Sequence, residues 1–307
     1  MYAPIIIFCY NRADHLAQTY EALKACPEAK DSDLFVFSDG AKNDSAEKGV
    51  KEVRAFLQNI KLDSAFKTTT ITEAPENKGL AKSIIDGVTE VIKKYGRAIV
   101  LEDDCVPSPY LLGFMNKCLD ELKYDMRVGS IAGFTPDFGI PKSYNADVFT
   151  TFRSCSWGWA TWADRWERVD WELSDRSILK SREFIKKFNS VGSDRFIRLY
   201  RQVNGDGSSW SVRFGAHLVK NNMLTVYPKY SYISNIGCDE SGVHSKKDDA
   251  EKMRVDLSKA IADPKIEFVA PDQLVLKLMK KHYSGGLVSD IKRAVATSVI
   301  MLKEKFR

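Results

Sequence analysis

The stretch that most constrains the fold of this chain is residues 97–104, Arg-Ala-Ile-Val-Leu-Glu-Asp-Asp. Its apolar centre predicts a buried parallel strand, and three carboxylates (Glu102, Asp103 and Asp104, the acid triplet) follow where the strand ends. Adjacent acids repel one another unless a cation lies beside them, and carboxylate oxygens suit Mg²⁺ or Mn²⁺. The triplet therefore indicates a metal site or, as the plainer alternative, a solvated acidic turn.

Strands and helices alternate before this stretch. Apolar or β-branched runs predict strands at 3–9, 34–37, 68–72 and 97–102, with amphipathic helices between them. Because parallel strands need crossover connections, this order predicts an α/β fold with a mostly parallel sheet flanked by helices. Such folds bind ligands beyond the carboxyl ends of their strands.

Polar residues or glycine follow each predicted strand. Any one of these groups could be a simple turn, but their shared position at one sheet edge favours a pocket for a base, a ribose and a diphosphate. The chain has no Gly-x-Gly-x-x-Gly after its first strand and no P-loop, which argues against a classical dinucleotide or triphosphate site. The groups are Tyr10-Asn11-Arg12, Asp39-Gly40, Asn77-Lys78-Gly79 and the acid triplet.

These motifs, in this order, resemble the nucleotide-sugar half of GT-A fold glycosyltransferases, of both the family 2 type and the N-acetylglucosaminyltransferase I type. The resemblance covers roughly the first third of the chain and implies a Rossmann-like GT-A domain. It also implies metal-dependent sugar transfer from a nucleotide-sugar, with UDP as the expected nucleotide. The motifs are Phe8-x-Tyr10-Asn11-Arg12, Ser38-Asp39-Gly40, Asn77-x-Gly79-Leu80-Ala81 and Leu101-Glu102-Asp103-Asp104.

The resemblance assigns roles to single residues. Asp39 would read the nucleobase, Asp104 would bind Mn²⁺ or Mg²⁺, and His244 in a later polar loop would complete the metal shell. A solvated loop position is the alternative for His244. The donor pocket as a whole would be formed by Tyr10, Asn11, Arg12, Asp39, Asn77, Gly79, Glu102 and Asp103.

Five of the six tryptophans lie between residues 157 and 171. Aromatic residues usually pack in cores, and we expect this of Trp162 and Trp166. Gly158, between Trp157 and Trp159, indicates a close turn at which a ring can stack on a sugar. Trp157, Gly158 and Trp159 are therefore acceptor-binding candidates, with core packing as the alternative. The same run resembles bacterial surface-polysaccharide sugar transferases.

An inverting transfer needs a carboxylate base that takes the proton of the acceptor hydroxyl. In the enzymes that the chain resembles, an acid begins the helix before a Val-Tyr-Pro-like strand, here at residues 226–228. Ser208 stands where that aspartate is expected, so the chain departs from the pattern. Asp206 is our candidate base and Asp194 the second candidate; each could instead be a helix cap or loop acid.

The chain divides into a GT-A domain over 1–245 (a nucleotide-sugar half, 1–133, and an acceptor half, 134–245), an extension over 246–283 and a tail over 284–307. From Lys280 to the end, seven basic and two acidic residues account for the whole net charge of +5. Basicity confined to a tail argues against a nucleic-acid groove. We expect a basic amphipathic helix after 284–286, which docks on an anionic membrane surface or packs on the enzyme body.

The six cysteines are scattered without a Cys-x-x-Cys pair, which predicts neither a zinc knuckle nor a disulfide framework. No stretch reads as a signal peptide or approaches the roughly 20 apolar residues of a membrane span. We therefore expect a cytoplasmic enzyme, peripheral at the inner face of the cell membrane, that acts on a glycan or lipid-linked glycan. A sugar nucleotidyltransferase, which needs a glycine-rich first loop, and a metal-free carbohydrate-binding protein are the alternatives.

Overall fold

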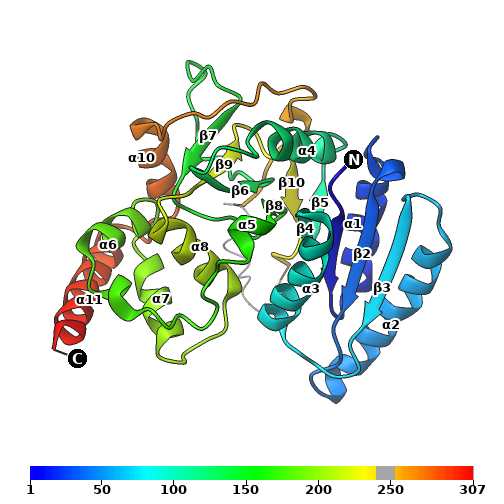
Figure 1. Cartoon of the computed structure of the whole chain (residues 1–307), viewed down its shortest axis with the longest axis horizontal. Coiled ribbons are helices and arrows are strands. Elements are labelled where there is room, and N and C mark those ends of the chain that lie inside the picture. The colour runs from blue at the N-terminus through cyan, green and yellow to red at the C-terminus, as the bar shows by residue number, and fades with distance from the viewer. Residues whose placement is uncertain (240–252, 307) are drawn as a thin grey trace.

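The computed structural model describes residues 1–239 and 253–306. An eight-stranded sheet in the order β3-β2-β1-β4-β8-β6-β9-β7 forms the centre of the molecule (Figure 1), and β5 pairs with β10 in a small second sheet. The strands are β1 (Ile5–Cys9), β2 (Asp33–Ser38), β3 (Thr68–Glu73), β4 (Arg97–Glu102), β5 (Cys105–Pro107), β6 (Val128–Ala132), β7 (Val148–Thr151), β8 (Trp159–Trp162), β9 (Leu224–Pro228) and β10 (Ile233–Asn235).

Helices cover both faces of this sheet. The α-helices are α1 (Ala13–Lys24), α2 (Asp44–Leu62), α3 (Leu80–Tyr95), α4 (Leu111–Glu121), α5 (Ala163–Trp166), α6 (Arg182–Phe188), α7 (Arg195–Val203), α8 (Trp210–Lys220), α10 (Gln273–His282) and α11 (Leu287–Lys305). Three short 3-10 helices are η1 (Ala29–Asp31), η2 (Arg176–Leu179) and η3 (Leu257–Lys259).

Residues 1–133, the predicted nucleotide-sugar half, have the expected βα order. β1 pairs in parallel with β2 and β4, and β2 pairs in parallel with β3. One hydrophobic core joins this sheet to α1, α2 and α4, and a second core on the opposite face joins it to α3 and α8. The predicted α/β class, with a mostly parallel sheet between helices, is therefore confirmed.

Residues 134–239, in the predicted acceptor half, continue the same sheet through an antiparallel strand. β8 lies between β4 and β6 and is antiparallel to both, with Trp159 opposite Val100. The turn predicted at Gly158 directly precedes this strand, which was not itself predicted from the sequence. Its Trp-Ala-Thr-Trp sequence is too short to show a strand period, and both edges of the strand are covered by neighbours.

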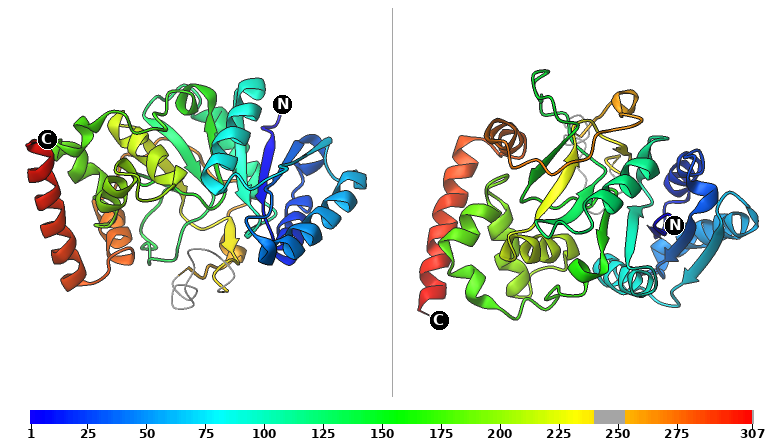
Figure 2. Two further views of the ribbon diagram at one scale, coloured as in Figure 1. Left: turned by 90° about the horizontal axis from the view of Figure 1, so that it is seen from below. Right: turned by 45° about the horizontal axis from the view of Figure 1, so that its top comes forward.

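A third core joins α6, α7 and α8, and α11 packs against it through Ile300 and Met301. α11 forms one end of the molecule, and α2 with β3 forms the other (Figures 1 and 2). The predicted tail helix is thus confirmed.

All six cysteines are free, as expected. Cys155 lies in the loop between β7 and β8. Among the described residues, no helix has the length and apolarity needed to cross a bilayer.

Candidate active site

The acid triplet lies beside the residues that follow β1. The register of β1 and β4 puts Phe8 opposite Glu102, so both loops leave the sheet side by side. The Arg12 guanidinium donates to the carboxylates of both Asp103 and Asp104, at 2.7 Å to Asp104 Oδ2. The backbone N–H of Tyr10 also donates to Asp103 Oδ2 (3.4 Å). The two loops that were predicted to share the donor pocket are therefore joined by charge-assisted hydrogen bonds.

The acid triplet carries more negative charge than Arg12 can offset. Asp103 and Asp104 are buried, and three carboxylates against one guanidinium leave a formal charge of −2. Burial raises the pKa of Asp103 to about 6, although Arg12 opposes the shift. Burial, reinforced by the charges of Asp104 and Asp103, raises the pKa of Glu102 well above its ordinary range. These shifts show that the protein alone does not fully stabilise three ionised acids here.

The segment after β10 closes one side of Asp104. Asn235 Nδ2 donates to Asp104 Oδ1 (3.0 Å), and the N–H of Ile236 donates to the Asp104 backbone oxygen (2.9 Å). A Cβ at Gly237 would lie 2.2 Å from Asp104 Oδ2, so glycine is required for this close approach. The sequence analysis missed Asn235, since only the pairing of β10 with β5 brings it to Asp104.

Asp39 forms a second cluster at the end of β2. Its Oδ1 accepts from the N–H groups of Gly40 (2.9 Å) and Lys78 (2.8 Å), and its Oδ2 accepts from Gly79 N (2.9 Å) and Asn77 Nδ2 (3.1 Å). Asn77 Nδ2 also donates to the Gly40 oxygen at 2.8 Å. A carboxylate accepts about four hydrogen bonds. Asp39 therefore holds the 76–79 loop against the end of β2.

The loop after β1 connects the two clusters. The Tyr10 hydroxyl accepts from Lys42 N (3.0 Å), next to the Asp39 cluster, while Arg12 bonds the acid triplet. Asn11 is half-buried, and its backbone oxygen would lie 2.5 Å from a Cβ at Gly49 in α2. The structure thus gathers all eight predicted donor-site residues at the carboxyl ends of β1, β2, β3 and β4.

The predicted acceptor residues divide into two kinds. Trp157 is half-buried and packs edge-on against Phe134, with ring centroids 4.7 Å apart. Gly158 has a φ of +61° and accepts from Gly133 N (2.7 Å). Trp159 is only 1% exposed and stacks on Trp166 and Trp210.

The assignment of Trp159 to the acceptor site is therefore corrected, because its ring faces are already covered by the core. The acceptor role of Trp157 and Gly158 stays a prediction. Since Trp159 lies opposite Val100 in the antiparallel pair, Trp157 and Gly158 lie beside the acid-bearing end of β4.

The candidate bases lie in the acceptor half. Asp206 is exposed between Gly205 and Gly207 in the loop from α7 to α8. Asp194 precedes α7, is 3.8 Å from Arg198, and has a buried Oδ1 without a hydrogen-bond partner among the described residues. No hydrogen bond or ion pair in the described part of the chain joins either acid to the acid triplet, and both remain predictions.

The metal prediction fits the charge of the site. A divalent cation would offset the negative charge that Arg12 alone does not balance at the acid triplet, and Asp104 is held in place there by Arg12 and Asn235. Within residues 1–239 and 253–306, no three His, Cys, Asp or Glu side chains form a ligand set on their own. Any other ligands would come from the substrate or from His244, which lies outside the described residues.

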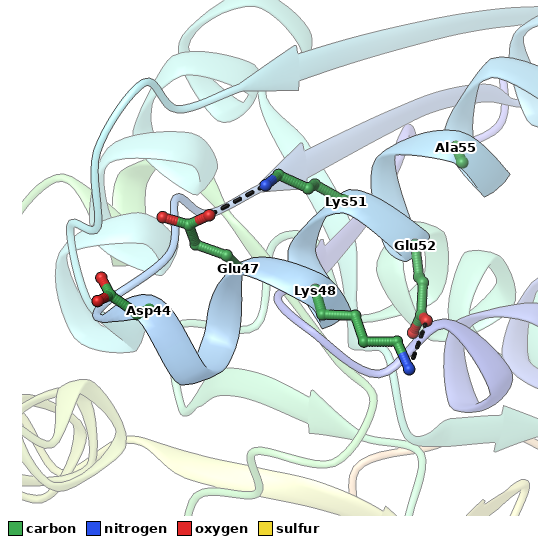
Figure 3. Close-up of a pocket in the computed structure, with 6 residues that line it drawn as sticks. All are labelled: Asp44, Glu47, Lys48, Lys51, Glu52 and Ala55. Carbon is green, nitrogen blue, oxygen red and sulfur yellow. Dashed lines mark hydrogen bonds and ion pairs between the residues drawn. The ribbon is translucent and has the colours of Figure 1, made fainter.

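A shallow surface depression lies along α2 (Figure 3). Its charged side chains already pair with one another, as in Lys51 with Glu47 (3.0 Å) and Lys48 with Glu52 (3.8 Å). These i,i+4 pairs are a solvated helix face, and the depression has no link to the acid triplet.

Two solved structures give distant likenesses. A mannosyltransferase from Pyrobaculum calidifontis, solved with GDP-Man and Mn²⁺, has 16% identity and a TM-score of 0.37; the match covers 55% of this chain and 47% of that chain. TarS from S. aureus has 11% identity and a TM-score of 0.40, over 76% of this chain and 36% of that chain. This chain thus spans about half the length of the first and about a third of the second.

A search of curated protein sequences gave no match. The sequence model described as "Glycosyl transferase family 2" matches residues 5–163, slightly more than half of the 307 residues. The matched range runs from β1 to the end of β8 and contains both the Asp39 cluster and the acid triplet. The chain therefore belongs to glycosyl transferase family 2.

Proposed function

We propose that this glycosyltransferase moves a sugar from a nucleotide-sugar, with a UDP-sugar as the first candidate, to a glycan or lipid-linked glycan in surface polysaccharide synthesis. The observation that carries the proposal is the pair of clusters at one sheet edge. One carries surplus negative charge at Asp103 and Asp104, and the other orders a polar loop around Asp39. The mannosyltransferase solved with GDP-Man and Mn²⁺ is in keeping with a donor of this class.

The protein groups have distinct tasks in this proposal. Asp104 holds Mn²⁺ or Mg²⁺, which when bound offsets negative charge on the departing diphosphate. Arg12 keeps Asp103 and Asp104 in position before the donor arrives. Glu102 and Asp103 contact the ribose or sugar, and the 76–79 loop supports the diphosphate. A carboxylate of the acceptor half, Asp206 or Asp194, takes the proton from the attacking hydroxyl as the anomeric configuration inverts.

The donor proposal is tested with purified protein, Mn²⁺ and a panel of UDP-, GDP-, CMP- and dTDP-sugars. One donor should raise the melting temperature and release its nucleoside diphosphate. Asp104→Ala should lower the turnover by about a hundredfold to a thousandfold, because a group aimed at developing charge is lost. Asp86→Ala, which removes an acid from the exposed face of α3, is the control. Full activity of Asp104→Ala, or no response to any donor, would contradict the proposal.

The base is identified by a separate pair of variants. Asp206→Asn or Asp194→Asn should lower transfer to the acceptor by about a hundredfold or more, since general-base catalysis contributes that much. The thermal shift caused by the donor should remain in both variants, because neither acid contacts the donor residues. If both variants keep wild-type transfer rates, the base is another group.

We also propose that the enzyme works at the inner face of the cell membrane, where a lipid-linked acceptor is available. The exposed apolar side chains of α11 and its lysines support this location.

A further inference from the structure

The outer face of α11 is apolar and exposed. Its exposed fractions run from 47% for Val299 to 82% for Phe306 at the end of the helix. At 100° per residue these positions cover about a third of the helix circumference. Soluble proteins rarely leave a continuous apolar patch of this kind without a binding role. The outer stripe consists of Leu287, Val288, Ile291, Val295, Val299, Leu302 and Phe306.

The opposite face holds α11 on the enzyme body. Glu304 is buried and accepts from Arg176 at 2.6 Å. Asp290 accepts from Ser193 (2.6 Å) at the other end of the helix. Ile300 and Met301 pack against the core of α6, α7 and α8. Because these contacts hold only one side of the helix, the outer stripe faces solvent while the tail stays folded on the body.

The charges on α11 are sorted between the two faces. Lys292 and Lys303 lie along one edge of the outer stripe, and Lys305 lies along the other; all three are exposed. None of them takes part in an ion pair with another described residue. Both acids of the helix, Asp290 and Glu304, point to the body. The outer stripe is therefore bordered by positive charge alone.

This charge pattern selects the partner. A second copy of α11 would bring lysines against lysines, with no acid on either stripe to offset them. An anionic bilayer offers apolar chains beneath negative headgroups, which matches both the stripe and its borders. We propose that α11 is a membrane-docking helix that lies flat on anionic lipid and inserts its outer stripe between the headgroups.

The position of α11 gives this docking a consequence for the proposed function. α11 packs on α7, whereas β3 and α2 lie at the far end of the molecule (Figures 1 and 2). Docking would therefore hold the acceptor half near the lipid and the nucleotide-sugar half away from it. This orientation, which rests on the proposed function, suits an acceptor carried by a lipid and a donor that arrives from solution.

Vesicle binding of the full chain, measured by sedimentation without nucleotide-sugar, tests the docking separately from catalysis. The wild type should bind vesicles of phosphatidylglycerol mixed with phosphatidylcholine, bind phosphatidylcholine alone much more weakly, and lose affinity as salt rises. The triple variant Lys292→Gln, Lys303→Gln, Lys305→Gln should bind roughly a hundredfold more weakly, at about fivefold per lysine. The triple variant Ile291→Ser, Val295→Ser, Leu302→Ser should lose vesicle binding.

Control variants test whether vesicle binding depends on where in the protein the lysines and apolar side chains are removed. Lys61→Gln, Lys67→Gln, Lys93→Gln removes the same charge from exposed sites elsewhere, and Leu62→Ser removes an apolar side chain that is 86% exposed on α2; both should bind vesicles as the wild type does. Equal binding of the α11 variants and the controls would overturn the proposal. So would a wild type that ignores vesicles, including one that forms dimers through α11. Donor hydrolysis without vesicles reports on the active site independently.

Discussion

At the residue scale, Asp39 shows how one side chain can organise a pocket that it does not fill. Its carboxylate collects three backbone N–H groups and one side-chain amide. The close approach of Gly40 to the Glu76 backbone, where a Cβ would come within 2.4 Å, depends on this bonding. Asp39 was predicted to read the nucleobase; in the structure its first task is to fix the 76–79 loop.

We therefore expect Asp39→Ala to lower the free energy of unfolding by about 2–3 kcal/mol, because several buried N–H groups lose their acceptor together. Asp39→Asn keeps one acceptor oxygen and should cost less. Urea denaturation measures both values. Asp86→Asn on α3, whose acid pairs with Lys82 on an exposed face, should change stability by less than about 0.5 kcal/mol. Equal stabilities for Asp39→Ala and the wild type would show that the loop is held by other contacts.

The sequence predicted the donor residues well and the metal surroundings only in part. Residues that directly follow a strand of a parallel sheet must meet at one edge, so Arg12, Asp39 and Asp104 could be placed together from pattern alone. Asn235 and Gly237 could not, because no local signal says that a three-residue strand more than a hundred positions later pairs with β5. Trp159 was an acceptor candidate because it follows the turn at Gly158, and its core partner Trp210 could not be identified because it is distant in the sequence.

At the element scale, α11 is fastened by an ion pair whose two ends differ in exposure. The side chain of Glu304 is 2% exposed and that of Arg176 is 31% exposed. If Glu304 is replaced, the partly exposed Arg176 side chain can turn toward water. If Arg176 is replaced, the buried Glu304 side chain cannot do so. The two single substitutions are therefore not equivalent.

Arg176→Ala should lower the free energy of unfolding by about 3 kcal/mol, because it removes the positive charge that pairs with the buried Glu304 carboxylate. Glu304→Gln should cost about 1 kcal/mol. Hydrogen exchange at the α11 amides should accelerate in the same order. If Glu304→Gln is the more damaging change, the carboxylate has a role other than pairing with Arg176.

α8 carries a half-buried histidine, His217, whose pKa makes the stability of the fold depend on pH. Burial, with help from Lys220 and Arg168, lowers the pKa of His217 below its ordinary 6.5. The unfolded chain therefore takes up the proton first, and stability falls as the pH drops below that value.

His217→Gln should remove this contribution. Between about pH 7.5 and about pH 5.5, the free energy of unfolding should decrease less for the variant than for the wild type. Urea titrations at the two pH values make the comparison, and the wild type supplies the reference for all other titrating groups. If the free energy of unfolding decreased equally in both proteins, groups other than His217 would cause the sensitivity to acid.

At the scale of the whole molecule, the antiparallel β8 makes one sheet of both halves. β4 and β8 are paired along their lengths, from Arg97 with Trp162 to Val100 with Trp159. The second core also takes side chains from both sides of this seam, among them Ile84 and Trp210. Separate unfolding of the halves would break this pairing and expose that core.

We therefore expect a single cooperative transition. All six tryptophans lie between residues 157 and 210, so fluorescence reports on the acceptor half, whereas far-ultraviolet circular dichroism reports on the whole chain. The two signals should give the same urea midpoint. An earlier fluorescence midpoint would mean that the acceptor half unfolds alone.

The Gly237 backbone lies so close to the Asp104 carboxylate that the residue at position 237 must have no side chain. One added methyl group at that position would press on the carboxylate without altering any charged or hydrogen-bonding atom. The geometry of the Asp104 carboxylate, and with it the proposed cation site, thus depends on an empty volume no larger than a single carbon, which Gly237→Ala would fill.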